Sequence, residues 1–259
     1  MSPLRQIDGW PTRHAATALI TRDGVQHTHG DVEHPFPWAS VTKIATAVAV
    51  LVAVEEGIVS LDDPLGPEGS TVRHLLAHAS GLPPEAGPKL APPGARRIYS
   101  NAGFEELALH VERAAEMPFD AYFESVWGFG TGDSAAHGIV GTIDPLIEVA
   151  KELLTPTRLS PDTLAEATTV QFPGIAGVLP GFGRFTPNDW GLGFELRDGK
   201  DPHWMGRANS PSSFGHFGRS GTFLWVDPVA GIALACLTDL EFGDWAKDAW
   251  PRLSDAVLA

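Results

Sequence analysis

The sequence predicts a mixed α/β (α+β) fold, in which helices flank an antiparallel sheet built from both ends of the chain. Segments typical of short strands stand at 15–30 and again at 214–239. An apolar run at 44–54 predicts a helix that is buried on all sides, and further helical segments fill the middle of the chain. Strands at both ends with helices between them imply one sheet with a mostly helical subdomain inserted into it.

The first elements are a hairpin and the buried helix. Ala15–Ile20 and residues 25–30 read as two strands joined at Asp23-Gly24, a pair typical of tight hairpin turns. The helix that follows contains Ser40 and Lys43 near its start, and Glu55-Glu56-Gly57 ends it.

The remaining elements follow in order along the chain. Ser160 and Pro161 have the cap and first-turn positions of a short helix. The predicted helices lie at 72–79, 104–116, 118–127, 144–154, 160–168 and 244–258. The predicted strands lie at 190–196 and 214–218 and in a hairpin of 222–228 with 231–239.

Composition and charge exclude several classes of function. The chain has 259 residues and a formal net charge of −14, without basic runs. This argues against a nucleic acid or an anionic membrane surface as a partner. No signal peptide or membrane-spanning segment is visible, so we expect a cytoplasmic protein. Cys236 is the single cysteine and lies in an apolar run, which favours a buried structural thiol.

Two pairs of histidines raise the question of a metal site. His27 and His29 would share one face of a strand, but no carboxylate at a matching spacing completes a site. His74 and His78 stand four apart on a helix, but the glutamate of His-Glu-x-x-His and a nearby third ligand are missing. We therefore expect neither a metal nor another cofactor.

Ser40 and Lys43 form the strongest chemical feature. On a helix, positions i and i+3 lie on one face, with Cβ atoms about 5–6 Å apart. Burial disfavours a charged ammonium, so the lysine amine can accept or relay the serine proton. The helix N-terminus adds a positive potential where an oxyanion would develop. The pair thus predicts a covalent nucleophile.

Two further short motifs follow the serine and lysine in chain order, namely Tyr99-x-Asn101 and His216-x-Gly218. By chance, this composition would give Ser-x-x-Lys about 0.3 times, His-x-Gly about once and Tyr-x-Asn about 0.02 times. Each motif alone is weak, so the specificity lies in the ordered set and its context.

With these motifs and their flanks, the sequence resembles the serine β-lactamase-like hydrolases of the branch that contains class C β-lactamases, D-alanyl-D-alanine carboxypeptidases and β-lactamase-fold esterases. The resemblance covers about residues 13–240. The flanks that carry it include Trp38-Ala39-Ser40-Val41-Thr42-Lys43, Leu61-Asp62-Asp63-Pro64, His74-Leu75-Leu76-Ala77-His78-Ala79-Ser80-Gly81-Leu82 and Gly215-His216-Phe217-Gly218. It implies a single β-lactamase/transpeptidase-like domain over residues 1–259, with a reduced helical subdomain at about 62–168.

The resemblance also implies roles for the first two motifs. Ser40 would be the acylated nucleophile and Lys43 its proton partner. Tyr99 would be the general base for acylation and the acid for the leaving group. Asn101 would hydrogen-bond the Lys43 ammonium and a substrate amide or carbonyl.

For the third motif, the resemblance implies a strand that lines the site through His216, Phe217 and Gly218. The oxyanion hole would consist of the backbone N–H groups of Ser40 and Arg219. A merely structural role for His216 stays open.

The third motif departs from the Lys-Thr-Gly form of β-lactamases. His216 is a weaker, pH-dependent cation, and Phe217 offers no hydroxyl for a substrate carboxylate. An ester or lactone with an apolar body should suit Phe217 better. Tyr99 and His216 are also only 117 positions apart, which is short for the branch that the sequence resembles, so the resemblance implies a trimmed helical subdomain and a more open cleft.

The sequence therefore predicts a serine hydrolase with a carboxylesterase or lactonase activity on a small substrate. The alternatives are a β-lactamase or D-alanyl-D-alanine carboxypeptidase and, from another class, a disabled binding protein of the same fold. The expected partner is a small ester, lactone, amide or β-lactam. The sequence makes no prediction about the oligomeric state.

Overall fold

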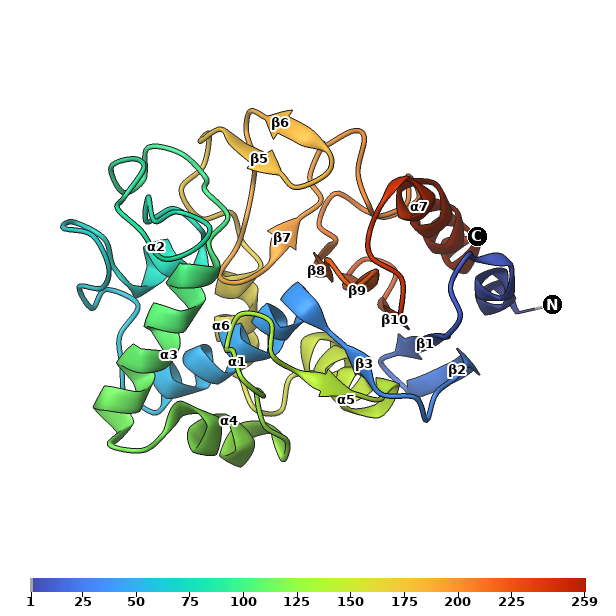
Figure 1. Ribbon diagram of the computed structural model, residues 1–259, viewed down its shortest axis with the longest axis horizontal. Coiled ribbons are helices and arrows are strands. Elements are labelled where there is room, and N and C mark those ends of the chain that lie inside the picture. Colours follow the sequence, from blue (N-terminus) through green and yellow to red (C-terminus); the bar gives the residue numbers. More distant parts are fainter. Residues whose placement is uncertain (1) are drawn as a thin grey trace. The chain divides into compact units, whose positions relative to one another are not determined.

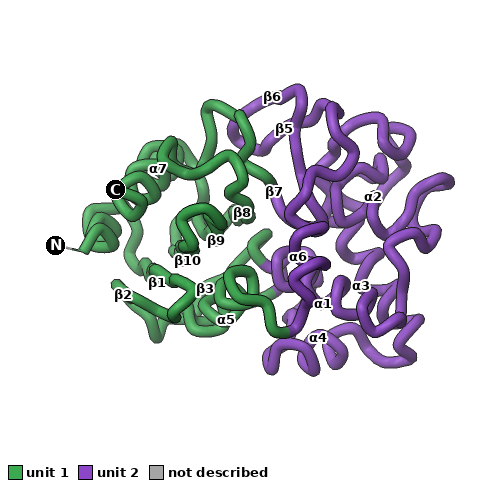
Figure 2. Tube along the Cα trace, turned by 180° about the vertical axis from the view of Figure 1, so that it is seen from behind, with its two compact units in different colours: residues 1–41, 139–157, 196–259 green, residues 42–138, 158–195 purple. Residues whose placement is uncertain are grey.

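An antiparallel sheet of six strands is the centre of one of two units into which the chain folds (Figure 2). The computed structural model describes residues 2–259. Unit 1 comprises residues 1–41, 139–157 and 196–259, and unit 2 comprises residues 42–138 and 158–195. Among the described residues, no helix is long and apolar enough to cross a membrane. The assignment of residues 1–259 to a single domain, with a helical subdomain at about 62–168, stays a prediction.

The sheet of unit 1 joins the two ends of the chain. β1 pairs antiparallel with β10, with Ala15 opposite Thr238, and this confirms the predicted sheet of both termini. The strand order is β2-β1-β10-β9-β8-β7. The bounds are β1 (Ala15–Thr21), β2 (Gly24–Gly30), β7 (Glu195–Leu196), β8 (Phe214–Gly218), β9 (Thr222–Asp227) and β10 (Ile232–Thr238).

Two long helices pack against this sheet, α5 (Ile143–Leu154) and α7 (Asp244–Leu258). Figure 1 shows the strands between them, with α7 on one side and α5 on the other. α5 packs against β1, β9 and β10. Trp250 of α7 packs against Phe223 of β9, and Ser254 accepts a hydrogen bond from Trp225 Nε1. Unit 1 also contains η1 (Pro3–Gly9), η2 (Ala39–Val41), β3 (Phe36–Pro37) and β4 (Val140–Gly141).

Unit 2 is mainly helical and is built around α1. Every residue from Thr42 to Ala53 in α1 is buried, as its apolar sequence predicts. α3 packs against α1, α2 and α4. The bounds are α1 (Thr42–Glu55), α2 (Val72–Leu76), α3 (Asn101–Ala115), α4 (Phe119–Trp127), α6 (Pro161–Ala167), β5 (Gly177–Leu179) and β6 (Gly183–Phe185).

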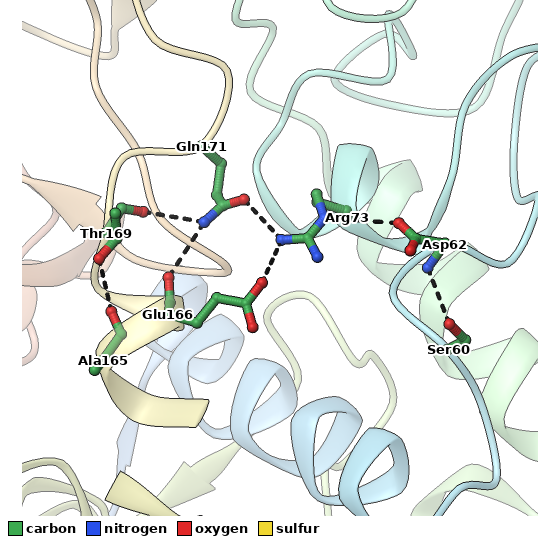
Figure 3. A network of polar contacts seen from close by, with 7 residues as sticks. All are labelled: Ser60, Asp62, Arg73, Ala165, Glu166, Thr169 and Gln171. Atoms are coloured by element: carbon green, nitrogen blue, oxygen red, sulfur yellow. Dashed lines mark hydrogen bonds and ion pairs between the residues drawn. The ribbon is translucent and has the colours of Figure 1, made fainter. Parts of the chain in front are cut away.

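Arg73 of α2 links several segments of unit 2 (Figure 3). Its guanidinium donates to Glu166 of α6 at 2.6 Å and to the Gln171 side-chain oxygen at 2.9 Å. The carboxylate of Asp62 lies 3.9 Å away on the opposite side. This network holds α2 against α6 and the segment that follows α6.

Four predicted elements differ from the structure. The helix predicted at 104–116 begins already at Asn101, after the cap residue Ser100. Ser40 lies in the 3-10 turn η2, and α1 begins only at Thr42. The helix predicted at 72–79 ends at Leu76, because His78 adopts a left-handed backbone with φ 54°. Only the last two residues of the strand predicted at 190–196 are extended. There, Gly193 has φ 90° and Gly191 N bonds Phe194 O, so the chain turns sharply.

Candidate active site

Lys43, Tyr99 and Asn101 lie together in unit 2. The Lys43 side chain is fully buried. Its Nζ donates to Asn101 Oδ1 at 2.6 Å and to Ala136 O at 2.9 Å. The same nitrogen lies 4.8 Å from the centre of the Tyr99 ring. The structure thus places the lysine beside two of the side chains that the sequence predicts as its partners.

Burial controls the ionisation of Lys43. Removal from water lowers the pKa of the amine from 10.5 to about 7, while the carboxylates of Glu105 and Glu85 act in the opposite direction. Near neutral pH, the amine therefore exists in both protonation states. Proton transfer is most efficient with a group of this pKa.

The segment that carries Tyr99 and Asn101 is held from both sides. Ser100 caps α3 by accepting a hydrogen bond from Gly103 N at 3.0 Å, and Asn101 is the first residue of the helix. Two residues before Tyr99, the buried guanidinium of Arg97 donates to the carbonyl oxygens of Asn188 and Gln171 at 3.0 and 2.8 Å. The two candidate residues are therefore on a fixed part of the chain.

Ser40 and Gly218 belong to unit 1, where η2 packs against β8 and β9. Trp38 O, next to the turn, accepts a hydrogen bond from Thr222 Oγ1 of β9 at 2.8 Å. Ala39 has φ 47°, a left-handed conformation that is unusual for alanine. Packing thus over-determines the backbone immediately before the candidate nucleophile.

Gly218 permits the close approach of this turn. A Cβ at position 218 would lie 2.5 Å from Trp38 O and even closer to Thr222 Oγ1. It would also lie 3.1 Å from the Ala39 Cβ. No side chain larger than hydrogen fits at this point of β8 without displacing the turn that carries Ser40.

His216 and Phe217 project to opposite faces of β8, because side chains alternate along a strand. His216 shares its face with Gly218 and is 3% exposed. Its Nδ1 donates to Phe217 O at 2.7 Å, which fixes the proton on Nδ1 because a carbonyl oxygen only accepts. Nε2 then accepts a proton or a hydrogen bond when the ring is neutral.

Phe217 belongs to an aromatic cluster on the α7 side of the sheet. Its ring centre lies 4.9 Å from that of Phe242 and 5.9 Å from that of Trp250. Gly218 and the Ser40 turn lie on the other face. The Phe217 ring, expected to favour apolar substrates, therefore packs away from the face that carries Ser40.

Arg219, the other expected oxyanion residue, directly follows β8. Its carbonyl accepts a hydrogen bond from Phe242 N at 2.8 Å, and its exposed side chain pairs with Glu241 at 3.3 Å. The side chain points to solvent, so any role in the site belongs to the backbone.

The histidines, the carboxylates and the single cysteine of residues 2–259 are not arranged as a metal site. No three His, Cys, Asp or Glu side chains of this range are grouped for a metal ion. His29 instead hydrogen-bonds Asp8 at 2.7 Å, and His74 bonds Thr71. The Cys236 thiol is fully buried, which raises its pKa.

Comparison with known proteins decides the family. Residues 7–128 and 124–258 match the model of the Beta-lactamase family. The chain belongs to the β-lactamase family. It is 51% identical to a β-lactamase from Mycobacterium bovis, and the two structures agree with a TM-score of 0.96 over 99% of this chain and 98% of that one.

More distant members of the β-lactamase fold also match over nearly the whole chain. Simvastatin synthase from Aspergillus terreus is 17% identical, with a TM-score of 0.78 over 99% of this chain and 93% of that one. EstCE1, a hydrolase with promiscuous acyltransferase activity, is 17% identical, with a TM-score of 0.77 over 99% and 97%. No curated protein matches significantly. Membership in the β-lactamase family places this chain among the serine hydrolases.

Two parts of the lysine environment were missed by the sequence reasoning about this β-lactamase-family protein. Glu105 accepts hydrogen bonds from Ser134 Oγ and, at 3.2 Å, from Ala136 N. It thereby holds the loop whose carbonyl at Ala136 binds Lys43. Neither residue stands in a motif, and a backbone carbonyl has no sequence signal at all.

Proposed function

We propose that the protein is a serine hydrolase that forms an acyl-enzyme on Ser40 and acts as a carboxylesterase or lactonase on a small substrate. The setting of Lys43 supports this proposal most directly. A neutral amine has two N–H bonds and one lone pair. Asn101 Oδ1 and Ala136 O each accept a hydrogen bond from Lys43 Nζ, which engages two N–H bonds, and the remaining position on a neutral nitrogen is the lone pair. Such an amine is a proton acceptor.

In the proposed reaction, Ser40 Oγ attacks the carbonyl carbon of the substrate and gives its proton to the Tyr99 oxygen, while the phenolic proton of Tyr99 passes to the neutral Lys43 amine. The carbonyl oxygen becomes an oxyanion, which the backbone N–H groups of Ser40 and Arg219 stabilise. The proton then goes to the leaving oxygen, which departs as an alcohol. Water attacks the acyl group in the second half, releases a carboxylic acid and restores Ser40.

The third motif favours esters over β-lactams in this proposal. His216 stands where β-lactamases have a lysine, and its ring is neutral or charged according to pH. Phe217 offers no hydroxyl, and its ring faces the α7 cluster. A substrate carboxylate would thus bind less strongly to His216 than to the lysine of a Lys-Thr-Gly motif. The second candidate is a β-lactamase or D-alanyl-D-alanine carboxypeptidase, which the 51% identity to a protein described as a β-lactamase favours.

Acylation at Ser40 is the direct test. We expect wild-type protein to give a burst of p-nitrophenol from p-nitrophenyl acetate and to gain one acetyl group on the peptide with Ser40. Ser40→Ala should show neither. Equal hydrolysis by both proteins would contradict the proposal, and faster turnover of nitrocefin than of esters would select the second candidate.

The pH dependence of ester hydrolysis should follow the Lys43 amine. The proton-accepting form is present above its pKa of about 7, so kcat/KM should rise with pH through this region. Glu85→Gln and Glu105→Gln each remove a carboxylate that raises this pKa. We expect both variants to shift the acid limb of the pH–rate profile to lower pH.

Glu106→Gln is the matched control for these variants. Glu106 follows Glu105 in α3 and is not among the carboxylates that raise the Lys43 pKa. Its substitution should leave the acid limb in place. A limb that moves to higher pH in Glu105→Gln would show that another group controls the rate.

A further inference from the structure

His78 contacts Tyr99 through its ring. The imidazole is 1% exposed, and its centre lies 4.7 Å from the centre of the Tyr99 ring. Trp190 contacts the same imidazole edge-on at 4.8 Å, and Phe104 lies at 5.3 Å. The histidine therefore lies in a closed aromatic group beside the phenol.

His78 also holds the backbone on both sides of Tyr99. Ser100 N donates to His78 Nδ1 at 3.1 Å, and Ile98 N donates to His78 O at 2.9 Å. Tyr99 lies between these two bonds in sequence. Because a backbone N–H only donates, Nδ1 must keep its lone pair, so the ring carries its proton on Nε2. This is the opposite tautomer to that of His216.

The backbone of His78 is in an unusual conformation. Its φ of 54° lies in the left-handed region, which few non-glycine residues adopt. The preceding helix α2 is fixed by Arg73 (Figure 3), and Ala77 O accepts a hydrogen bond from the Arg97 guanidinium at 2.5 Å. Such conformations persist where the surroundings determine them and cluster at functional sites.

We propose that His78 is the positioning residue of Tyr99. It sets the phenol relative to Lys43 through ring contact and through the hydrogen bond that its Nδ1 accepts from Ser100 N. The role rests on the proposed acylation of Ser40, in which Tyr99 transfers a proton. His78 itself touches no reacting atom.

Two substitutions separate the two contacts of His78. His78→Phe keeps an aromatic ring beside Tyr99 but removes the acceptor for Ser100 N. His78→Asn places a carbonyl oxygen near the former Nδ1 and suits a left-handed backbone, since asparagine is enriched there. We expect His78→Phe to lower kcat for p-nitrophenyl acetate about 10- to 100-fold with little change in KM, as a misplaced catalytic group would. His78→Asn, which supplies an acceptor for Ser100 N, should keep most of the wild-type kcat.

A Tyr99→Phe background tests whether His78 acts through the phenol. There, His78→Phe should cost less than about 3-fold, because the group that it positions is already absent. Equal losses in both backgrounds, or no loss in wild type, would overturn the proposal. His74→Phe, the same change four residues earlier, is the control and should leave kcat unchanged. Circular dichroism and thermal unfolding show that each variant is folded.

Failure of the proposed function has a different signature. If wild-type protein is not acylated at Ser40, the serine hydrolase proposal fails before any histidine variant is compared. If wild type is acylated and His78→Phe acts equally with and without the Tyr99 hydroxyl, only the positioning role fails.

Discussion

Replacement of Gly218 by alanine should lower kcat/KM for ester substrates by at least about 100-fold, the effect expected when a reacting group is misplaced by about 1 Å. The new Cβ would lie 2.4 Å from Thr222 Oγ1, 2.5 Å from Trp38 O and 3.1 Å from the Ala39 Cβ. Two of these groups belong to the segment that leads directly into Ser40. Relief of the overlap must move either this turn or the strand, so Ser40 N and Arg219 N would lose their mutual placement.

The same substitution should destabilise the fold by about 1–3 kcal/mol, as overpacking does. Steady-state kinetics and urea unfolding measure the two effects. Gly199→Ala is a suitable control in unit 1, because no atom lies within 4 Å of a Cβ built there. A Gly218→Ala protein with normal kcat/KM would show that the close approach of turn and strand is not required for activity.

The largest effect of pH on stability should come from Lys43. Its pKa is about 7 in the folded chain, against 10.5 for an unperturbed lysine. Between these values, the unfolded state binds more protons than the folded state, so the free energy of unfolding rises with pH. The slope reaches about 1.4 kcal/mol per pH unit. Below pH 7 both states are protonated, and burial of the charge costs stability in full.

Lys43→Met isolates this contribution. Urea unfolding of wild type and Lys43→Met from pH 6 to 9 gives the difference in their free energies of unfolding. We expect this difference to move in favour of wild type as the pH rises above 7. The lost hydrogen bonds to Asn101 and Ala136 contribute a constant that does not depend on pH.

Lys89→Met provides the reference for that experiment, because Lys89 is exposed in the same unit. The difference in free energy of unfolding between Lys89→Met and wild type should not change from pH 6 to 9. A flat difference for Lys43→Met as well would show that the buried amine keeps its ordinary ionisation in the folded chain. Lys43→Met, unlike Lys89→Met, should also lose acylation of Ser40.

The sequence predicted the sheet and the long helices, and the structure confirms both. These predictions succeeded because hydrophobic periodicity is a local signal. Tyr99 and Asn101 lie beside Lys43, and the catalytic roles assigned to the three residues stay predictions. The direction of the Phe217 ring could not be predicted in the same way. It depends on which face of β8 meets α7, and this is set by packing between residues far apart in sequence.

The left-handed backbone conformations of two residues could not be predicted from the sequence either. Ala39 and His78 adopt left-handed conformations although neither is glycine, so the residue type alone does not predict the positive φ. His78 resembled one half of a metal pair, and its hydrogen bond from Ser100 N becomes visible only when residues 22 positions apart meet. Glu105 and Ala136 likewise act on Lys43 through tertiary contacts alone.

The buried Cys236 has a practical consequence for experiments on this chain. With a single cysteine that is fully enclosed and whose burial raises its pKa, the folded protein offers no native thiol to maleimide reagents. A cysteine introduced at an exposed position, such as Lys89 in the loop between α2 and α3, would thus be the one site of labelling. Fluorophores or spin labels can then follow this loop during turnover without prior removal of the native residue.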